Sequence, residues 1–404
     1  MLQRRVLLYL VAFAFIFAAA PRLHAQQTAP APSPRTAPAE RDAQEPIKIF
    51  TEEVLLPVVA YDDYGHFDPT VESDDLLMLE DGVPQQVKSI RRIPATVVLL
   101  LGTGNEMNPA QRTSITRDVA LRFASSLRPG DKIAVLQFDR RVETLQDWTT
   151  APAEVVHALN TKLHSGRGSR LAEALTQAAA RFKDQPRGNR HLVLIADGVD
   201  MPSNADYAEA MKVLAAANAE RSGAQSGVTE AMKQLVAAQV TVHVISYAAL
   251  GQQTKKEKAK SASSSSVPPG SVRASGIERI GIDPTMPPTA SRVGASVGIG
   301  ITFDPQMRRL RKAYEQALKR SEQQLTSLAD ETGGRILSPT STSEMIAQGN
   351  EVAREIDAQY VVTYQPKRPL ANAAPGEYRR IQVSPRRTGL HVRAQRGYVA
   401  TAIH

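Results

Sequence analysis

The chain has 404 residues, a formal net charge of +8 and no cysteine. The lack of cysteine excludes disulfides, thiol nucleophiles and cysteine metal sites, and a chain of this length can bury a sufficient core without disulfides. The basic residues do not gather in a stripe with interleaved aromatic residues, so nucleic acid is not an expected partner.

Residues 1–25 have the pattern of an export signal. Arg4 and Arg5 form a basic start, and the segment from Val6 to Ala20 is an apolar run followed by a helix-breaking proline and a small residue. The run is shorter than the roughly 20 apolar residues that a membrane span needs. We therefore expect an exported protein, periplasmic or secreted, that is cleaved after Ala25. The alternative is an uncleaved N-terminal anchor.

Two segments precede the main body of the chain. Residues 26–46 are rich in proline and alanine without an apolar period, which predicts a semi-extended linker. Residues 47–94 alternate in hydrophobicity between turn residues, which predicts a small β segment. The expected strands are Val54–Asp62, Leu76–Glu80 and Val83–Ile93.

Residues 95–250 alternate apolar strands with amphipathic helices. This alternation predicts an α/β fold with a doubly wound, mostly parallel sheet and helices on both faces. The expected strands are Val97–Leu101, Lys132–Phe138, His191–Asp197 and Val240–Ser246, with Val142–Trp148 as an antiparallel edge strand. The expected helices are Ala110–Leu127, Ala153–Leu163, Leu171–Phe182, Ala205–Ala217 and Val228–Ala238.

The pattern is interrupted after this region and then resumes. Residues 251–306 hold a lysine run, a serine run and two Pro-Pro pairs, which predicts a low-complexity disordered insertion. The alternative is a loop that becomes ordered on a partner. Residues 307–356 then complete the α/β domain. They supply the expected helix Met307–Gly334, the short strand Arg335–Leu337 and the helix Ser343–Ile356.

Residues 357–404 form a second β segment. Neither this segment nor residues 47–94 has enough strands to be stable alone, and the two flank the α/β unit. We therefore expect them to pair into one β-sandwich-like domain. The expected C-terminal strands are Gln359–Pro366, Tyr378–Pro385 and Leu390–Ala400.

The candidate site lies where ligands bind in a doubly wound sheet, at the carboxyl ends of the strands. Three loops are expected there: Gly102 to Glu106, Gly166 to Ser169, and Asp197-Gly198. The second is not a phosphate-binding P-loop, because it lacks the Gly-Lys-Ser/Thr ending. No HExxH pair or G-x-S-x-G elbow is present, so an enzyme is not expected. A hydrolase remains a third hypothesis.

At this point the chain resembles the von Willebrand factor type A (VWA) family. LVLIADGVD is similar to the family's strand that ends in Asp-Gly, and RPGDKIAVLQFD to its second strand. The flanking EDGVPQQV, LADETGG, QYVVTYQP and RGYVA resemble a secreted bacterial subgroup called VWFA-related, described from acidobacteria. The resemblance covers about Ala95 to Ser246 and Leu325 to Ile356, and it implies a VWA fold.

The resemblance also implies where a metal would bind. The family's metal-ion-dependent adhesion site is similar to Asp-x-Ser-x-Ser on the first loop, a Thr on the second and an Asp on the third, and Mg²⁺ suits such oxygen ligands. In this chain Ser169 replaces the threonine and Asp197 matches the aspartate. The first motif becomes Gly102-Thr103-Gly104-Asn105-Glu106, which lacks the first carboxylate and both serine hydroxyls. We therefore expect a degenerate metal site and no cofactor.

The leading hypothesis is an exported, non-enzymatic protein–protein interaction or adhesion module. The turn Gly102-Thr103-Gly104-Asn105 is then a partner-binding loop that can offer backbone N–H groups to a partner's carboxylate or backbone. The alternative is a Mg²⁺-dependent adhesion receptor that uses Glu106, Ser169 and Asp197. The sequence predicts a protein partner and leaves the envelope association and the oligomeric state open.

Overall fold

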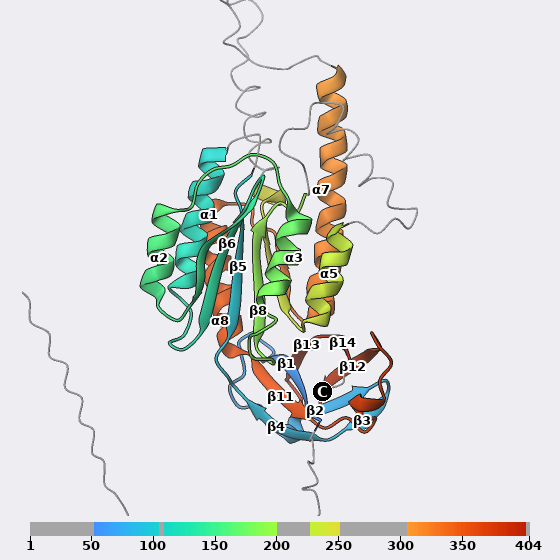
Figure 1. The fold of residues 1–404 in the computed structure, drawn as a ribbon. Coiled ribbons are helices and arrows are strands. Elements are labelled where there is room, and N and C mark those ends of the chain that lie inside the picture. Colours follow the sequence, from blue (N-terminus) through green and yellow to red (C-terminus); the bar gives the residue numbers. More distant parts are fainter. Residues whose placement is uncertain (1–51, 105–108, 200–226, 251–304, 401–404) are drawn as a thin grey trace, which may run out of the picture. The chain divides into compact units, whose positions relative to one another are not determined.

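A six-stranded sheet forms the centre of the α/β domain in the computed structural model (Figure 1). The strand order is β10-β9-β8-β5-β6-β7, and only β7 runs antiparallel to its neighbour. The predicted α/β fold and the antiparallel edge strand are therefore confirmed. The strands are β5 (Thr96–Gly102), β6 (Lys132–Phe138), β7 (Val142–Thr149), β8 (Arg190–Ala196), β9 (Thr241–Ser246) and β10 (Ile336–Leu337).

The structure describes residues 52–104, 109–199, 227–250 and 305–400. The predicted signal, the linker, the expected helix Ala205–Ala217 and the insertion up to residue 304 lie outside the described residues. The described residues all belong to one unit, Thr51–His404. The finer division of this unit into domains at the boundaries given above stays a prediction.

Helices cover both faces of the sheet, because alternate residues of each strand point to opposite sides. In β5, Leu99 packs with helices α1, α2 and α8, whereas Leu100 packs with α3, α5 and α7. Figure 1 shows the two helical layers on either side of the strands. The helices are α1 (Pro109–Ala124), α2 (Pro152–Thr161), α3 (Leu171–Arg181), α5 (Gly227–Ala237), α7 (Pro305–Thr332) and α8 (Thr342–Ala358).

Two four-stranded antiparallel sheets form the β-sandwich, in the orders β13-β1-β11-β4 and β14-β12-β2-β3. β1 pairs with β11 and β2 pairs with β12, so strands from before and after the α/β domain pair in both sheets, as expected. The strands are β1 (Val54–Tyr61), β2 (Leu76–Glu80), β3 (Val83–Gln85), β4 (Val87–Arg91), β11 (Tyr360–Tyr364), β12 (Tyr378–Pro385), β13 (His391–Ala394) and β14 (Gly397–Val399). Two short 3-10 helices, η1 (Ser73–Asp75) and η3 (Leu370–Asn372), complete the unit.

Two strand predictions are wrong. The expected strands Val83–Ile93 and Leu390–Ala400 are each two strands, and the halves lie in different sheets. Alternation of apolar and polar residues continues while the chain crosses from one sheet to the other, so the sequence pattern does not mark the crossing. At the second crossing Gly397 is required, because a Cβ there would lie 2.3 Å from the Tyr378 hydroxyl oxygen.

A buried ionic network lies within the otherwise hydrophobic core of the sandwich. Arg379 is fully buried, and its Nη1 donates to Glu80 Oε1 at 3.0 Å and to the Arg368 carbonyl at 2.7 Å. The other Glu80 oxygen accepts from the Tyr364 hydroxyl at 2.7 Å and from Tyr398 at 3.2 Å. A buried charge is tolerated only when it is paired and hydrogen-bonded in this way.

A second buried network joins α8 to the sandwich. The fully buried Glu355 pairs with Arg335 Nε at 2.9 Å and with Arg393 of β13. Burial raises the pKa of Glu355, although both arginines act in the opposite direction. His243 of β9 lies 3.6 Å from the same carboxylate and stacks on His191 of β8. The α/β domain and the sandwich are therefore joined by buried ion pairs in addition to the covalent backbone.

Candidate functional site

Two predicted loops meet at the carboxyl edge of the sheet. Gly104, just after β5, forms a parallel bridge with Gly166. A Cβ at Gly104 would lie 1.6 Å from the Gly168 carbonyl oxygen, and one at Gly166 would lie 1.7 Å from Asp139 Oδ2. Only glycine permits these approaches. The first two predicted loops are thus brought together, and the end of β6 joins them.

The third predicted loop presents Asp197 at the end of β8. Asp197 as a residue is 8% exposed, and its carboxylate already has partners within the chain. Oδ2 accepts from Arg112 Nη1 at 2.8 Å and from the Tyr314 hydroxyl at 2.9 Å, while Oδ1 accepts from the Val199 amide at 3.3 Å. The sequence did not predict its two side-chain partners, Arg112 and Tyr314.

Arg112, in the first turns of α1, is held as a cation. Its guanidinium carbon lies 4.5 Å from the centre of the Tyr247 ring, and the Tyr247 hydroxyl is hydrogen-bonded to Thr116. Burial acts to lower the pKa of Arg112, but the Asp197 carboxylate outweighs it and the net pKa is raised. Burial raises the pKa of Tyr247 to about 12, so this ring stays neutral at physiological pH. The edge therefore contains the positive charge of Arg112 beside Asp197, the aspartate that matches the family pattern.

The described residues do not fit a Mg²⁺ site. Mg²⁺ requires an octahedron of oxygen ligands, whereas Gly102 and Gly104 have no side chain to offer one. A guanidinium 2.8 Å from Asp197 supplies the positive charge that a metal would otherwise bring. A serine at position 104 would also require the loop at Gly168 to move.

The other predicted site residues have different outcomes. Ser169 is half-buried and lies two residues before α3 begins. Thr103 is fully buried, its amide donates to the Phe138 carbonyl at 3.1 Å, and its hydroxyl has no hydrogen-bond partner among the described residues. Asn105 and Glu106 lie outside the described residues, so their part in the site stays a prediction.

Sequence reasoning missed Arg112, Tyr247 and Tyr314. Arg112 is 85 residues from Asp197 in the sequence, and Tyr314 is 117 residues away on the far side of the insertion. One signal was available, because α1 follows directly on the first loop and an arginine in its first turns must lie near the carboxyl edge. No sequence pattern indicated that α7 would bring a tyrosine to the same carboxylate.

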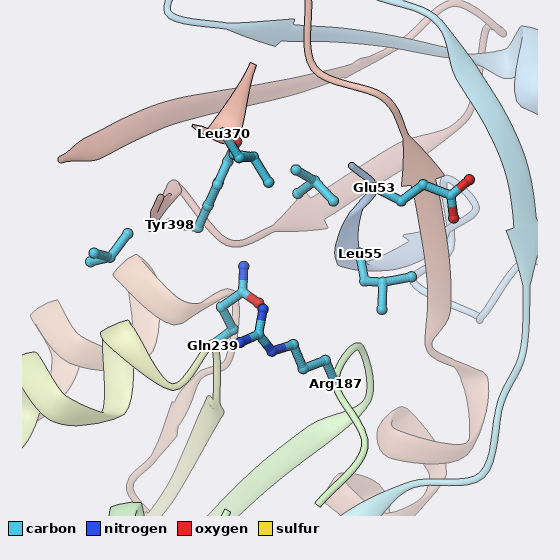
Figure 2. A pocket seen from close by; sticks show the side chains of 8 residues that line it. Glu53, Leu55, Arg187, Gln239, Leu370 and Tyr398 are labelled. Carbon is cyan, nitrogen blue, oxygen red and sulfur yellow. The ribbon is translucent and has the colours of Figure 1, made fainter. Parts of the chain in front are cut away.

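A pocket lies at the other end of the sheet, where Arg187 and Gln239 precede β8 and β9. It has an empty volume of about 350 Å³ and is open to solvent. Figure 2 shows Arg187 and Gln239 pointing into it from below Leu370 and Tyr398. The Tyr398 hydroxyl is already used by Glu80. This pocket offers one guanidinium, one amide and the Glu53 carboxylate, among the ring of Tyr398 and aliphatic side chains.

The doubly wound sheet, with three loops at its carboxyl edge, indicates the class of the α/β domain. Residues 97–199 match the family model described as von Willebrand factor type A domain, so this part of the chain is a VWA domain. No curated protein matches the chain. The assignment to the acidobacterial VWFA-related subgroup stays a prediction.

Solved structures resemble the chain at low sequence identity. The vWF domain of the type V pili tip protein Mfa5 from Porphyromonas gingivalis is 20% identical over 27% of this chain and 39% of its own, with a TM-score of 0.25. BatB, a conserved hypothetical protein from Bacteroides thetaiotaomicron, is 21% identical over 38% and 66%, with a TM-score of 0.27. A von Willebrand factor type A protein from Catenulispora acidiphila is 10% identical over 87% and 74%, with a TM-score of 0.37. The chain thus spans less than two thirds of the first two of these structures.

Proposed function

We propose that the protein is an exported protein-interaction module that binds its partner at the carboxyl edge of the VWA sheet without a metal ion. VWA domains are generally interaction modules and not enzymes, and residues 97–199 carry such a domain. The observation that carries metal independence is the Arg112–Asp197 ion pair. The guanidinium of Arg112 already occupies the carboxylate that a divalent cation would have to bind.

The chemistry of the edge supports binding in preference to catalysis. General acid–base catalysis needs a titratable group within reach of a substrate. Asp197 is engaged by Arg112, and Asp139 is buried with its Oδ1 accepting from the Arg141 amide at 2.9 Å. These two carboxylates, which the described residues place at the edge, therefore hold the loops in place. An edge built from three loops is suited to contact with another protein.

The location outside the cytoplasm is part of the proposal and rests on residues 1–25. These combine the basic start, the apolar run and the small residue of a cleavable signal. In the described part of the chain, no helix has the length and apolar character that crossing a membrane requires. The export proposal is tested independently of the binding site.

Site-specific photo-crosslinking in intact cells tests the binding surface. A photoreactive amino acid replaces Ser169 at the carboxyl edge, and in a matched control it replaces the exposed Lys183, which follows α3 near the opposite edge. We expect a discrete protein adduct from position 169 and none from position 183, in the presence of a chelator. An adduct that disappears with chelator and returns with Mg²⁺ would support the metal-dependent adhesion receptor instead. Equal adducts from both positions would contradict the assignment of the surface.

A further inference from the structure

Four exposed arginines surround the carboxyl edge of the VWA domain. Arg140 and Arg141 follow β6, and Arg167 and Arg170 lie in the loop that leads into α3. The two loops are in contact, because the Arg170 amide donates to the Asp139 carbonyl at 2.9 Å and Gly166 packs against the Asp139 carboxylate. The arginines therefore belong to one surface, which we call the arginine rim.

Half of the arginine rim is neutralised within the chain. Arg141 pairs with Glu143 at 3.0 Å, and Arg170 pairs with Glu173 at 3.0 Å. Arg140 and Arg167 have no ion-pair partner among the described residues. The Arg112 charge below the rim is already balanced by Asp197. The rim therefore exposes the guanidiniums of Arg140 and Arg167 to solvent, with the buried Asp139 carboxylate between the two loops.

A second feature of the same edge is a buried hydroxyl without a partner among the described residues. The Thr103 hydroxyl is completely buried and has no hydrogen-bond partner in the described part of the chain. Thr103 lies beside the start of the rim, since its amide donates to the carbonyl of Phe138, two residues before Arg140. A buried hydroxyl without a partner is rare in proteins, but a side chain on the surface of the rim does not reach a fully buried atom, so the unpaired guanidiniums of Arg140 and Arg167 carry the inference.

We propose that the arginine rim recognises a carboxylate-bearing segment of the partner protein and that Arg140 and Arg167 make the contacts directly. This proposal rests on the proposed function and adds the chemistry of the partner. A guanidinium offers two parallel N–H donors that match the two oxygens of a carboxylate. Two unpaired guanidiniums on touching loops therefore suit two acidic side chains of one segment.

The rim favours an acidic protein over a nucleic acid. The large exposed apolar side chains of the described residues are Tyr64, Val83, Val156 and Tyr378, and none belongs to the rim loops. Single-stranded nucleic acid is bound largely by stacking on such aromatic groups. The rim loops lack exposed aromatic side chains on which bases could stack.

Fluorescence anisotropy with the purified full chain tests the proposal. The probe is a labelled hexaglutamate peptide, with hexaglutamine as the uncharged control and oligothymidylate as the polyphosphate control. The test variant is Arg140→Glu/Arg167→Glu, and the control variant is Lys183→Glu/Arg354→Glu, which reverses two exposed charges away from the rim. Thermal melts of both variants establish that they fold as the unmodified chain does.

We expect hexaglutamate to bind at low salt, to weaken as salt is added, and to be indifferent to chelator and Mg²⁺. The rim variant should bind it about tenfold more weakly, whereas the control variant should change less than about twofold. Equal binding of hexaglutamine, an equal loss in the control variant, or displacement by oligothymidylate at lower concentration would overturn the proposal. If the photo-adduct at position 169 forms equally in the rim variant, the proposed function stands and the acidic partner is wrong.

Discussion

The guanidinium of Arg112 and the carboxylate of Asp197 lie 2.8 Å apart at the end of β8, with the Tyr314 hydroxyl on the same carboxylate oxygen. Three elements are thereby joined at one carboxylate: α1, the loop after β8, and α7. The aspartate that the family pattern assigns to a metal has a structural task in this chain.

Removing the charge of Arg112 should destabilise the protein. Arg112→Leu leaves Asp197 largely buried without its main partner, and we expect a loss of about 3 kcal/mol in the free energy of unfolding. Urea denaturation measures it. Arg112→Leu/Asp197→Asn should recover most of this loss, because no unpaired charge remains. Arg122→Leu, on an exposed position of the same helix, should change stability by less than about 0.5 kcal/mol. An Arg112→Leu variant as stable as its control would show that the ion pair contributes nothing.

Restoring a serine to the first loop should not restore a metal site. In Gly104→Ser the new Cβ would lie 1.6 Å from the Gly168 carbonyl oxygen, so the loops must separate. We expect a loss of more than about 2 kcal/mol and no heat of Mg²⁺ binding by calorimetry. Gly65→Ser is the control, because nothing lies within 4 Å of its added Cβ and only the strain of a positive φ is paid, about 1 kcal/mol. Tight Mg²⁺ binding by Gly104→Ser would refute this account of the edge.

The buried Arg379–Glu80 pair should be the most sensitive point of the sandwich. Arg379→Met leaves Glu80 and two backbone carbonyls without their hydrogen-bond donor. We expect the free energy of unfolding to fall by about 3–5 kcal/mol. The adjacent Arg380→Met changes an exposed side chain and should cost less than about 0.5 kcal/mol. Thermal or urea unfolding of the two variants gives the comparison, and similar losses in both would argue against the buried network.

Acid should destabilise the protein through the stacked histidines. Burial lowers the pKa of His191 from 6.5 to about 3, and it lowers the pKa of His243 as well. The unfolded chain then binds more protons than the folded one, so stability falls as the pH drops from 6.5 towards 3, by up to about 1.4 kcal/mol per pH unit for each histidine. Glu355 acts in the opposite direction, because its pKa is raised in the folded state.

Variants separate this contribution from the other titrating groups. His191→Gln should flatten the slope of unfolding free energy against pH in this window, whereas His157→Gln, at an exposed position of α2, should leave the slope unchanged. Urea unfolding at a series of pH values measures both. An unaltered slope in His191→Gln would mean that His191 is not kept neutral by burial.

Export is tested by the N-terminus of the mature protein. We expect protein recovered from outside the cytoplasm to begin at Gln26 in N-terminal sequencing. Ala25→Asp, which places a charge at the cleavage position, should leave the precursor uncut and membrane-associated. An N-terminus at Met1 in the unmodified protein would support the anchored alternative.

Much of the α/β domain was predictable from local sequence. The runs of apolar residues at β5, β6 and β8 predicted those strands to within one residue at each end, because strands covered on both faces need no polar positions. The position of Asp197 followed from the end of β8. The sandwich was predicted only in outline, because the sheet changes near Gln86 and Arg396 depend on which sheet each half-strand meets.

The internal cation was not predictable in the same way. Arg112 and Tyr314 reach Asp197 only after α1 and α7 pack on opposite faces of the sheet. An isolated arginine in a helix has the pattern of a solvated charge. What the sequence did show was the loss of ligand atoms at Gly102 and Gly104, and the structure adds the group that balances the remaining aspartate.

The interleaving of early and late strands in the sandwich has a consequence for biosynthesis. β1 and β2 leave the ribosome long before β11 and β12, their partners, have been translated. Until then these apolar segments have no sheet to join, while the α/β domain between them can already collapse. Completion of the sandwich therefore waits for the last strands of the chain, and until then its early strands are exposed to aggregation.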